Sequence, residues 1–190
     1  MSSLYQLKYF IQKPKLSEIF IIFDIDGVLL RNDGITIEFS PLIKPLFEFI
    51  ENNNIKYGIA THGMNHILLG NKQYSPISKY IHKLNPYFIK HIGQNKYNYN
   101  QYKYKMLNDL INQAVIEYDI KNVIFFDDDQ CNINSFIKLQ SLFKNLKFIP
   151  MHIEFNNTDI NEKQNYPLLR YNSFNNLTTN FTNIFYNLII

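Results

Sequence analysis

The strongest constraint on the fold is a short apolar run, Ile19–Phe23, which is followed directly by Asp-Ile-Asp-Gly. Every side chain of the run is β-branched or aromatic. Because successive side chains of a strand point to opposite faces, a run that is apolar throughout is typical of a strand covered on both sides. A second such run, Val123–Phe126, also ends in aspartates. These runs predict central strands of a parallel sheet, and therefore an α/β fold.

The other segments alternate between strand and helix patterns. Asn32-Asp33-Gly34 lies between apolar stretches and predicts a β-hairpin flap after the first strand. Ser40 and Pro41 are typical of the start of a helix. Further strands are expected at 56–60, 87–92, 122–126 and 146–153, with helices at 103–118 and 133–143. The alternation predicts a three-layer, Rossmann-like parallel sheet of about five strands with helices on both faces.

Length and composition fit one globular domain. The chain has 190 residues, of which 46% are hydrophobic and 18% charged. We expect a lead-in segment at 1–18, the α/β domain at 19–153, and a C-terminal extension at 154–190 that packs on the domain or trails it. Residues 94–102 are expected to form a polar loop, and 177–190 to form a closing helix or strand.

The same composition bears on compartment and partners. No apolar run approaches the ~18 residues of a membrane span, and no secretory signal is visible, so we expect a cytoplasmic protein without a membrane partner. Cys131 is the only cysteine, which excludes disulfides within the chain. The net charge of +3 is small and dispersed, and is weak evidence for a nucleic-acid partner.

Polar side chains follow three of the predicted strands at the points where the strands end. They are Asp24 and Asp26, Thr61, and Asp127 with Asp128. Ligands of parallel α/β sheets bind beyond the carboxyl ends of the strands, so these groups should meet at one edge. Clustered carboxylates repel one another unless a cation lies among them, and oxygen-only ligands favour a hard ion such as Mg²⁺.

These residues resemble the motifs of the haloacid dehalogenase superfamily of aspartate-nucleophile phosphatases. The segment from Phe23 to Leu29, Phe-Asp-Ile-Asp-Gly-Val-Leu, looks like its first motif, and Ile59-Ala60-Thr61 like its second. Lys105 lies in the interval for the motif-three lysine. Val123–Asp128 followed by Asn132 looks like the acidic fourth motif. The resemblance extends over about residues 19–153.

The resemblance implies a role for each residue. Asp24 would attack phosphorus, and Asp26 would protonate the leaving group and then activate water. Mg²⁺ would be held by the Asp24 carboxylate, the Asp26 carbonyl and Asp128. Thr61 and Lys105 would hold phosphoryl oxygens. Asp127 would orient the lysine or a metal-bound water. Asn132 would support the residues that contact the metal or substrate.

Several assignments have alternatives. Lys103 competes with Lys105, which we prefer because it begins the predicted helix at a spacing similar to that of the capless phosphatases. His62 is expected to pack locally rather than touch substrate, and Arg31 to be an exposed hairpin residue. Cys131 is expected to be a small buried residue without a catalytic base.

The intervals between the motifs leave no room for a cap domain. The sequence therefore resembles the capless branch of the family, similar to magnesium-dependent phosphatases. We expect an Mg²⁺-dependent phosphomonoester hydrolase with an open site for bulky phosphorylated substrates, such as a phosphoprotein or a nucleic-acid end. The alternatives are a nucleic-acid 3′-end phosphatase, which would need a clustered basic groove, and a non-catalytic binding protein of the same fold.

Overall fold

The structure is a computed structural model that describes residues 15–32, 37–39, 43–62, 80, 88–91, 99–154 and 168–170. Several predictions lie outside these residues. They concern the Asp33-Gly34 turn, the Ser40–Pro41 helix start, most of the lead-in segment at 1–18, and the segment 177–190.

The described residues form an α/β fold around a parallel sheet. In this part of the chain the sheet has six strands in the order β5-β4-β1-β6-β7-β8, and every neighbouring pair is parallel. Four strands are long, and β5 and β8 are three-residue strands at the edges. The bounds are β1 Ile19–Phe23, β4 Lys56–Thr61, β5 Ile89–His91, β6 Asn122–Asp127, β7 Lys147–Glu154 and β8 Leu168–Arg170.

The β1 strand lies inside the sheet, as its composition requires. All of its side chains are buried, and they alternate between two core clusters. Ile21 and Phe23 face one cluster, and Phe20 and Ile22 face the other. The prediction of a strand covered on both sides is therefore confirmed.

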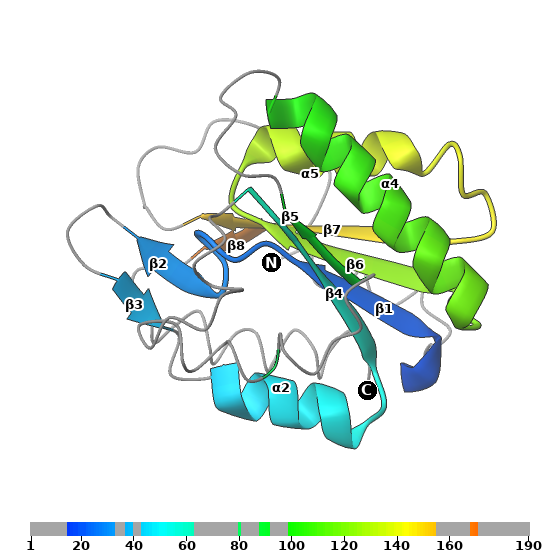
Figure 1. Ribbon diagram of the computed structural model, residues 1–190, viewed down its shortest axis with the longest axis horizontal. Coiled ribbons are helices and arrows are strands. Elements are labelled where there is room, and N and C mark those ends of the chain that lie inside the picture. Colours follow the sequence, from blue (N-terminus) through cyan, green and yellow to red (C-terminus); the bar gives the residue numbers. More distant parts are fainter. Residues whose placement is uncertain are drawn as a thin grey trace, which may run out of the picture.

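Helices lie on both sides of the sheet (Figure 1). Helix α2 (Ile43–Asn52) contributes Phe47 and Ile50 to the cluster that contains Phe23. Helices α4 (Tyr99–Glu117) and α5 (Gln130–Leu139) cover the opposite face. Their buried side chains in that cluster are Met106, Leu107, Leu110, Ile111, Ala114, Ile133, Phe136 and Leu139.

The predicted hairpin residues pair as expected. Strand β2 (Leu30–Asn32) pairs antiparallel with β3 (Ile37–Phe39), with Leu30 and Phe39 in register. The pair follows β1 directly along the chain and lies at the side of the sheet where β1 ends (Figure 1).

Two helices differ from prediction at their ends. Helix α4 begins at Tyr99, inside the polar segment that we expected to remain a loop until residue 102. Helix α5 begins at Gln130 instead of 133, because the Asp129 carboxylate accepts a hydrogen bond from the Cys131 amide and caps the helix earlier. Strand β8 was not predicted; it lies within the expected C-terminal extension and pairs with β7.

None of the helices among the described residues is long and apolar enough to cross a membrane.

Candidate active site at the carboxyl ends of β1 and β6

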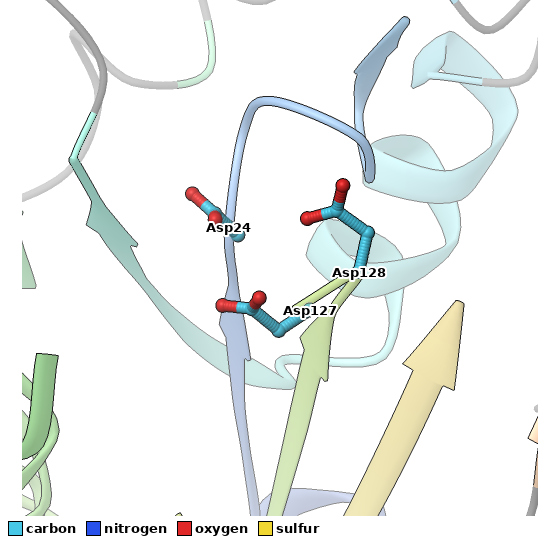
Figure 2. Close-up of side chains that lie close together, drawn as sticks. All are labelled: Asp24, Asp127 and Asp128. Atoms are coloured by element: carbon cyan, nitrogen blue, oxygen red, sulfur yellow. The ribbon is translucent and has the colours of Figure 1, made fainter. Parts of the chain in front are cut away.

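Three carboxylates meet where β1 and β6 end. These strands pair in parallel with Phe23 opposite Phe126, so Asp24 and Asp127 follow at the same level. Asp128 is the next residue. One carboxylate oxygen from each of the three residues lies within 4.8 Å of the others. Figure 2 shows the three side chains gathered at these strand ends.

A buried lysine neutralises part of this negative charge. The Lys103 Nζ lies 3.0 Å from Asp24 Oδ2 and 3.0 Å from Asp127 Oδ2. It also donates a hydrogen bond of 2.6 Å to the carbonyl of Ala60, near the end of β4. The side chain is fully buried, and its Nζ lies 5.8 Å from the centre of the Phe125 ring. One ammonium group thus connects the carboxyl ends of three parallel strands.

The structure places Lys103, the alternative to the preferred Lys105, beside the carboxylates. Lys105 is exposed and does not join the carboxylates. Two residues of an α-helix differ by about 200° in direction, so Lys103 and Lys105 face nearly opposite ways from α4. The predicted helix 103–118 contained both lysines. Lys103 lies three, four and seven residues before the buried Met106, Leu107 and Leu110, so the helical spacing in the sequence already favoured Lys103 for the buried face.

Backbone amides and Asn132 hold the two buried carboxylates. Asp24 Oδ1 accepts a hydrogen bond of 2.7 Å from the Ile25 amide. Asp127 Oδ1 accepts two, from the Asp129 amide at 2.9 Å and from Asn132 Nδ2 at 3.0 Å. A carboxylate oxygen has two lone pairs, so Asp127 Oδ1 is saturated, whereas Asp24 Oδ1 keeps one lone pair available.

Gly27 lies directly against Asp128. The glycine has a φ of +75°, and a Cβ built on it would lie 2.0 Å from Asp128 Oδ2. A side chain at position 27 would therefore fill the space of the Asp128 carboxylate, and the positive φ would strain it. Glycine is required here both for the turn after β1 and for the close approach of the two strand ends.

Burial and mutual repulsion raise the proton affinity of the acidic groups. Burial raises the pKa of Asp127 to about 7, although Lys103 opposes this effect. Burial, followed by the charge of Asp24, raises the pKa of Asp128 to about 6. The same two causes, in the same order, raise the pKa of Asp26. Burial alone would lower the pKa of Lys103, but Asp24 and Asp127 reverse this, and its pKa is raised.

The other predicted residues occupy the following positions. Thr61 is buried at the carboxyl end of β4, next to the carbonyl that accepts from Lys103. Asp26 is half-buried in the turn after β1, and its carboxylate is not part of the group formed by the other three aspartates. The buried Asn132 lies beside Asp127, as expected for a supporting residue.

Among the residues with alternatives, Cys131 differs from expectation. It is exposed, because the cap at Asp129 places it on the outward side of the first turn of α5. His62 is half-buried directly after β4. Arg31 lies in β2 opposite Glu38, and its side chain is outside the described part of the structure.

The sequence analysis overlooked His152. This buried residue of β7 pairs in register with Asp127, and its Nε2 lies 2.9 Å from the Asp128 carbonyl oxygen. A signal was present in the sequence. His152 is a polar residue near the end of a predicted parallel strand, at the edge where the aspartates were expected to meet.

The donor set fits a hard divalent cation. Asp24, Asp127 and Asp128 offer only carboxylate oxygens, and one lysine charge does not balance three carboxylates. Asp127 is already engaged by Lys103, Asn132 and the Asp129 amide, so a cation would be held mainly by Asp24 and the more exposed Asp128.

Searches of the sequence found no matching family model and no matching curated protein.

Proposed function

We propose that the protein is an Mg²⁺-dependent phosphomonoester hydrolase that forms an aspartyl-phosphate on Asp24, in the manner of the capless haloacid dehalogenase phosphatases. The observation that carries this proposal is the buried Lys103, which lies 3.0 Å from each of the Asp24 and Asp127 carboxylates at the ends of adjacent parallel strands. In the proposal, this lysine would orient the Asp24 carboxylate as the nucleophile and offset negative charge that develops beside it.

The chain's residues divide the reaction into two steps. In the first, an Asp24 oxygen attacks phosphorus, the ester P–O bond breaks, and the departing oxygen takes a proton from Asp26. In the second, the Asp26 carboxylate takes a proton from water, the water oxygen attacks phosphorus, and inorganic phosphate leaves Asp24. The raised pKa of Asp26 suits this alternation between acid and base.

In the proposal, several groups together offset the negative charge of the phosphoryl oxygens. Lys103 and Thr61 would face the phosphoryl oxygens from the ends of α4 and β4. Mg²⁺, held by Asp24 and Asp128, would supply further compensation for the charge that develops on those oxygens. Asp127 and Asn132 would keep the lysine in place, which their contacts already do.

The proposal includes an open site. Between Asp24 and Thr61 the structure contains the β2–β3 pair and α2, and the undescribed gaps 33–36 and 40–42 are too short for a lid domain. The β2–β3 pair would serve as a flap beside the site. Such a site would admit phosphorylated proteins or nucleic-acid ends as well as small phosphate esters.

The test is hydrolysis of para-nitrophenyl phosphate, followed by a panel of phosphopeptides, nucleotides, sugar phosphates and 3′-phosphorylated DNA. Activity should require Mg²⁺, disappear with excess chelator, and fall at least ~10³-fold in Asp24→Asn. Asp119→Asn is the matched control, because it makes the same change in the turn that precedes β6, at the opposite edge of the sheet. Equal activity of well-folded Asp24→Asn and wild-type protein would exclude the aspartyl-phosphate mechanism.

A further inference from the structure

We infer that His152 is a positioning residue of the site: it holds the Asp128–Asp129 peptide group and thereby sets the geometry of the acidic turn after β6. The inference rests on the cation site of the proposed function. It concerns a residue of β7 that lies outside the four sequence motifs.

The direction of the hydrogen bond follows from the partner. The His152 Nε2 lies 2.9 Å from the Asp128 carbonyl oxygen, and a carbonyl oxygen can only accept. Nε2 must therefore carry a proton and donate it. His152 is buried, with 5% of its surface exposed, and the strand pairing places it opposite Asp127, so the ring has a fixed approach to this carbonyl.

The same peptide group makes a second hydrogen bond on its other side. Its carbonyl is that of Asp128, and its N–H is that of Asp129, which donates to Asp127 Oδ1 at 2.9 Å. The plane of one peptide group is thus held at both ends, by a histidine and by a carboxylate. Rotation of this group would break both hydrogen bonds together.

This peptide group is linked to two carboxylates of the site. Asp127 accepts the hydrogen bond from its N–H, and the other oxygen of Asp127 pairs with Lys103, which pairs in turn with Asp24. Asp128 supplies its carbonyl, and the Asp128 carboxylate lies against Gly27 and belongs to the group that could hold a cation. By fixing the peptide group, His152 would set the spacing between the Asp127 carboxylate, which binds Lys103, and the Asp128 carboxylate.

The test combines His152→Leu, which removes the donor, with His152→Gln, whose amide nitrogen is separated from Cβ by as many bonds as Nε2 of histidine. Met151→Leu is the matched control, because Met151 is equally buried on the same strand and its side chain belongs to the core cluster. The probe is Mn²⁺, and its affinity is measured without substrate by titration calorimetry. We expect about tenfold weaker binding in His152→Leu, partial recovery in His152→Gln, and no change in Met151→Leu.

Two NMR measurements separate positioning from general stability. The Asp129 amide resonance should shift in His152→Leu, return toward its wild-type position in His152→Gln, and stay unchanged in Met151→Leu. In wild-type protein, ¹⁵N spectra of the imidazole should show a proton on Nε2; a ring protonated only on Nδ1 would overturn the inference, even if His152→Leu does not fold.

Failure of the inference and failure of the proposed function give different results. Wild-type Mn²⁺ affinity in a folded His152→Leu variant would reject the role of His152 and leave the hydrolase proposal standing. Weakened Mn²⁺ binding in that variant, together with no hydrolysis by the wild-type protein, would support the role of His152 and reject the hydrolase. A wild-type protein that does not bind Mn²⁺ would overturn both.

Discussion

The turns after β1 and β6 both begin with a buried aspartate, yet they are built by different means. The β6 turn is held by side chains: Asn132 binds Asp127, Asp129 caps α5, and His152 holds the intervening peptide group. The β1 turn relies on backbone geometry, since Gly27 has a positive φ and leaves room for Asp128. The β6 turn is therefore fixed by several side-chain hydrogen bonds. The β1 turn depends on one glycine, whose position no other residue type fits without strain.

The largest effect is expected from removing the lysine that joins the two turns. Lys103→Met leaves two buried carboxylates without their cation, and should lower the free energy of unfolding by about 3 kcal/mol. In the proposed mechanism the charge of Lys103 offsets charge on the phosphoryl group, so the substitution should also reduce kcat/KM by at least ~100-fold. Urea denaturation and steady-state kinetics provide the measurements.

Lys105→Met is the control for this substitution, because it makes the same change on the exposed side of the same helix. It should alter neither stability nor activity. A larger loss in Lys105→Met than in Lys103→Met would contradict our placement of the phosphate-binding lysine.

Gly27→Ala tests the turn after β1. The methyl group meets the Asp128 carboxylate, and alanine is disfavoured at this φ by about 1–2 kcal/mol, so both stability and Mn²⁺ affinity should fall. Asp129→Ala, at the other turn, should cost about 1 kcal/mol by removing a helix cap while its backbone amide still reaches Asp127. Thermal denaturation and Mn²⁺ titration of both variants measure the contrast. Equal Mn²⁺ affinity in Gly27→Ala and wild-type protein would mean that the close approach is dispensable.

A smaller effect is expected from pH, and it should act through the β6 turn. The pKa of Asp128 is raised to about 6, so the carboxylate is ionised above this pH and takes up a proton below it. Protons then compete with the cation, and Mn²⁺ affinity at pH 5 should be about tenfold weaker than at pH 8. Titration calorimetry at several pH values measures this change. An affinity that is constant from pH 5 to 8 would exclude Asp128 as a ligand.

The sequence predicted the buried framework well, because its signal is local. Strands β1 and β6 are recognisable because their side chains are apolar on both faces of the strand. The aspartates after them were expected to meet at one edge of the sheet, and the structure places them there. The start of α4 was missed because residues 99–102 are polar or aromatic and show no apolar residues at helical spacing. Lys105 was preferred for a separate reason, its spacing from the other motifs, although Lys103 shares the helical spacing of the buried Met106 and Leu110.

The contacts that hold the site together could not be predicted in the same way. Three contacts depend on strand order and register, which bring together residues that are distant in the chain. They are the hydrogen bond of His152 to Asp128, that of Lys103 to the Ala60 carbonyl, and the fit of Gly27 against Asp128. A hydrogen bond to a carbonyl leaves no mark on residue type, because every residue has one. These features become visible only when neighbouring strands are placed side by side.

The contact of Lys103 with three strand ends has a consequence for how the native state fluctuates. Helix α4 cannot separate from the sheet without exposing a charge that Asp24, Asp127 and the Ala60 carbonyl now hold. Local opening of α4 would therefore remove the charge pairing and the helix cover in one event, as a cooperative unit in hydrogen exchange. In the proposed mechanism, molecules in this open state would lack the lysine beside Asp24 and would not turn over substrate.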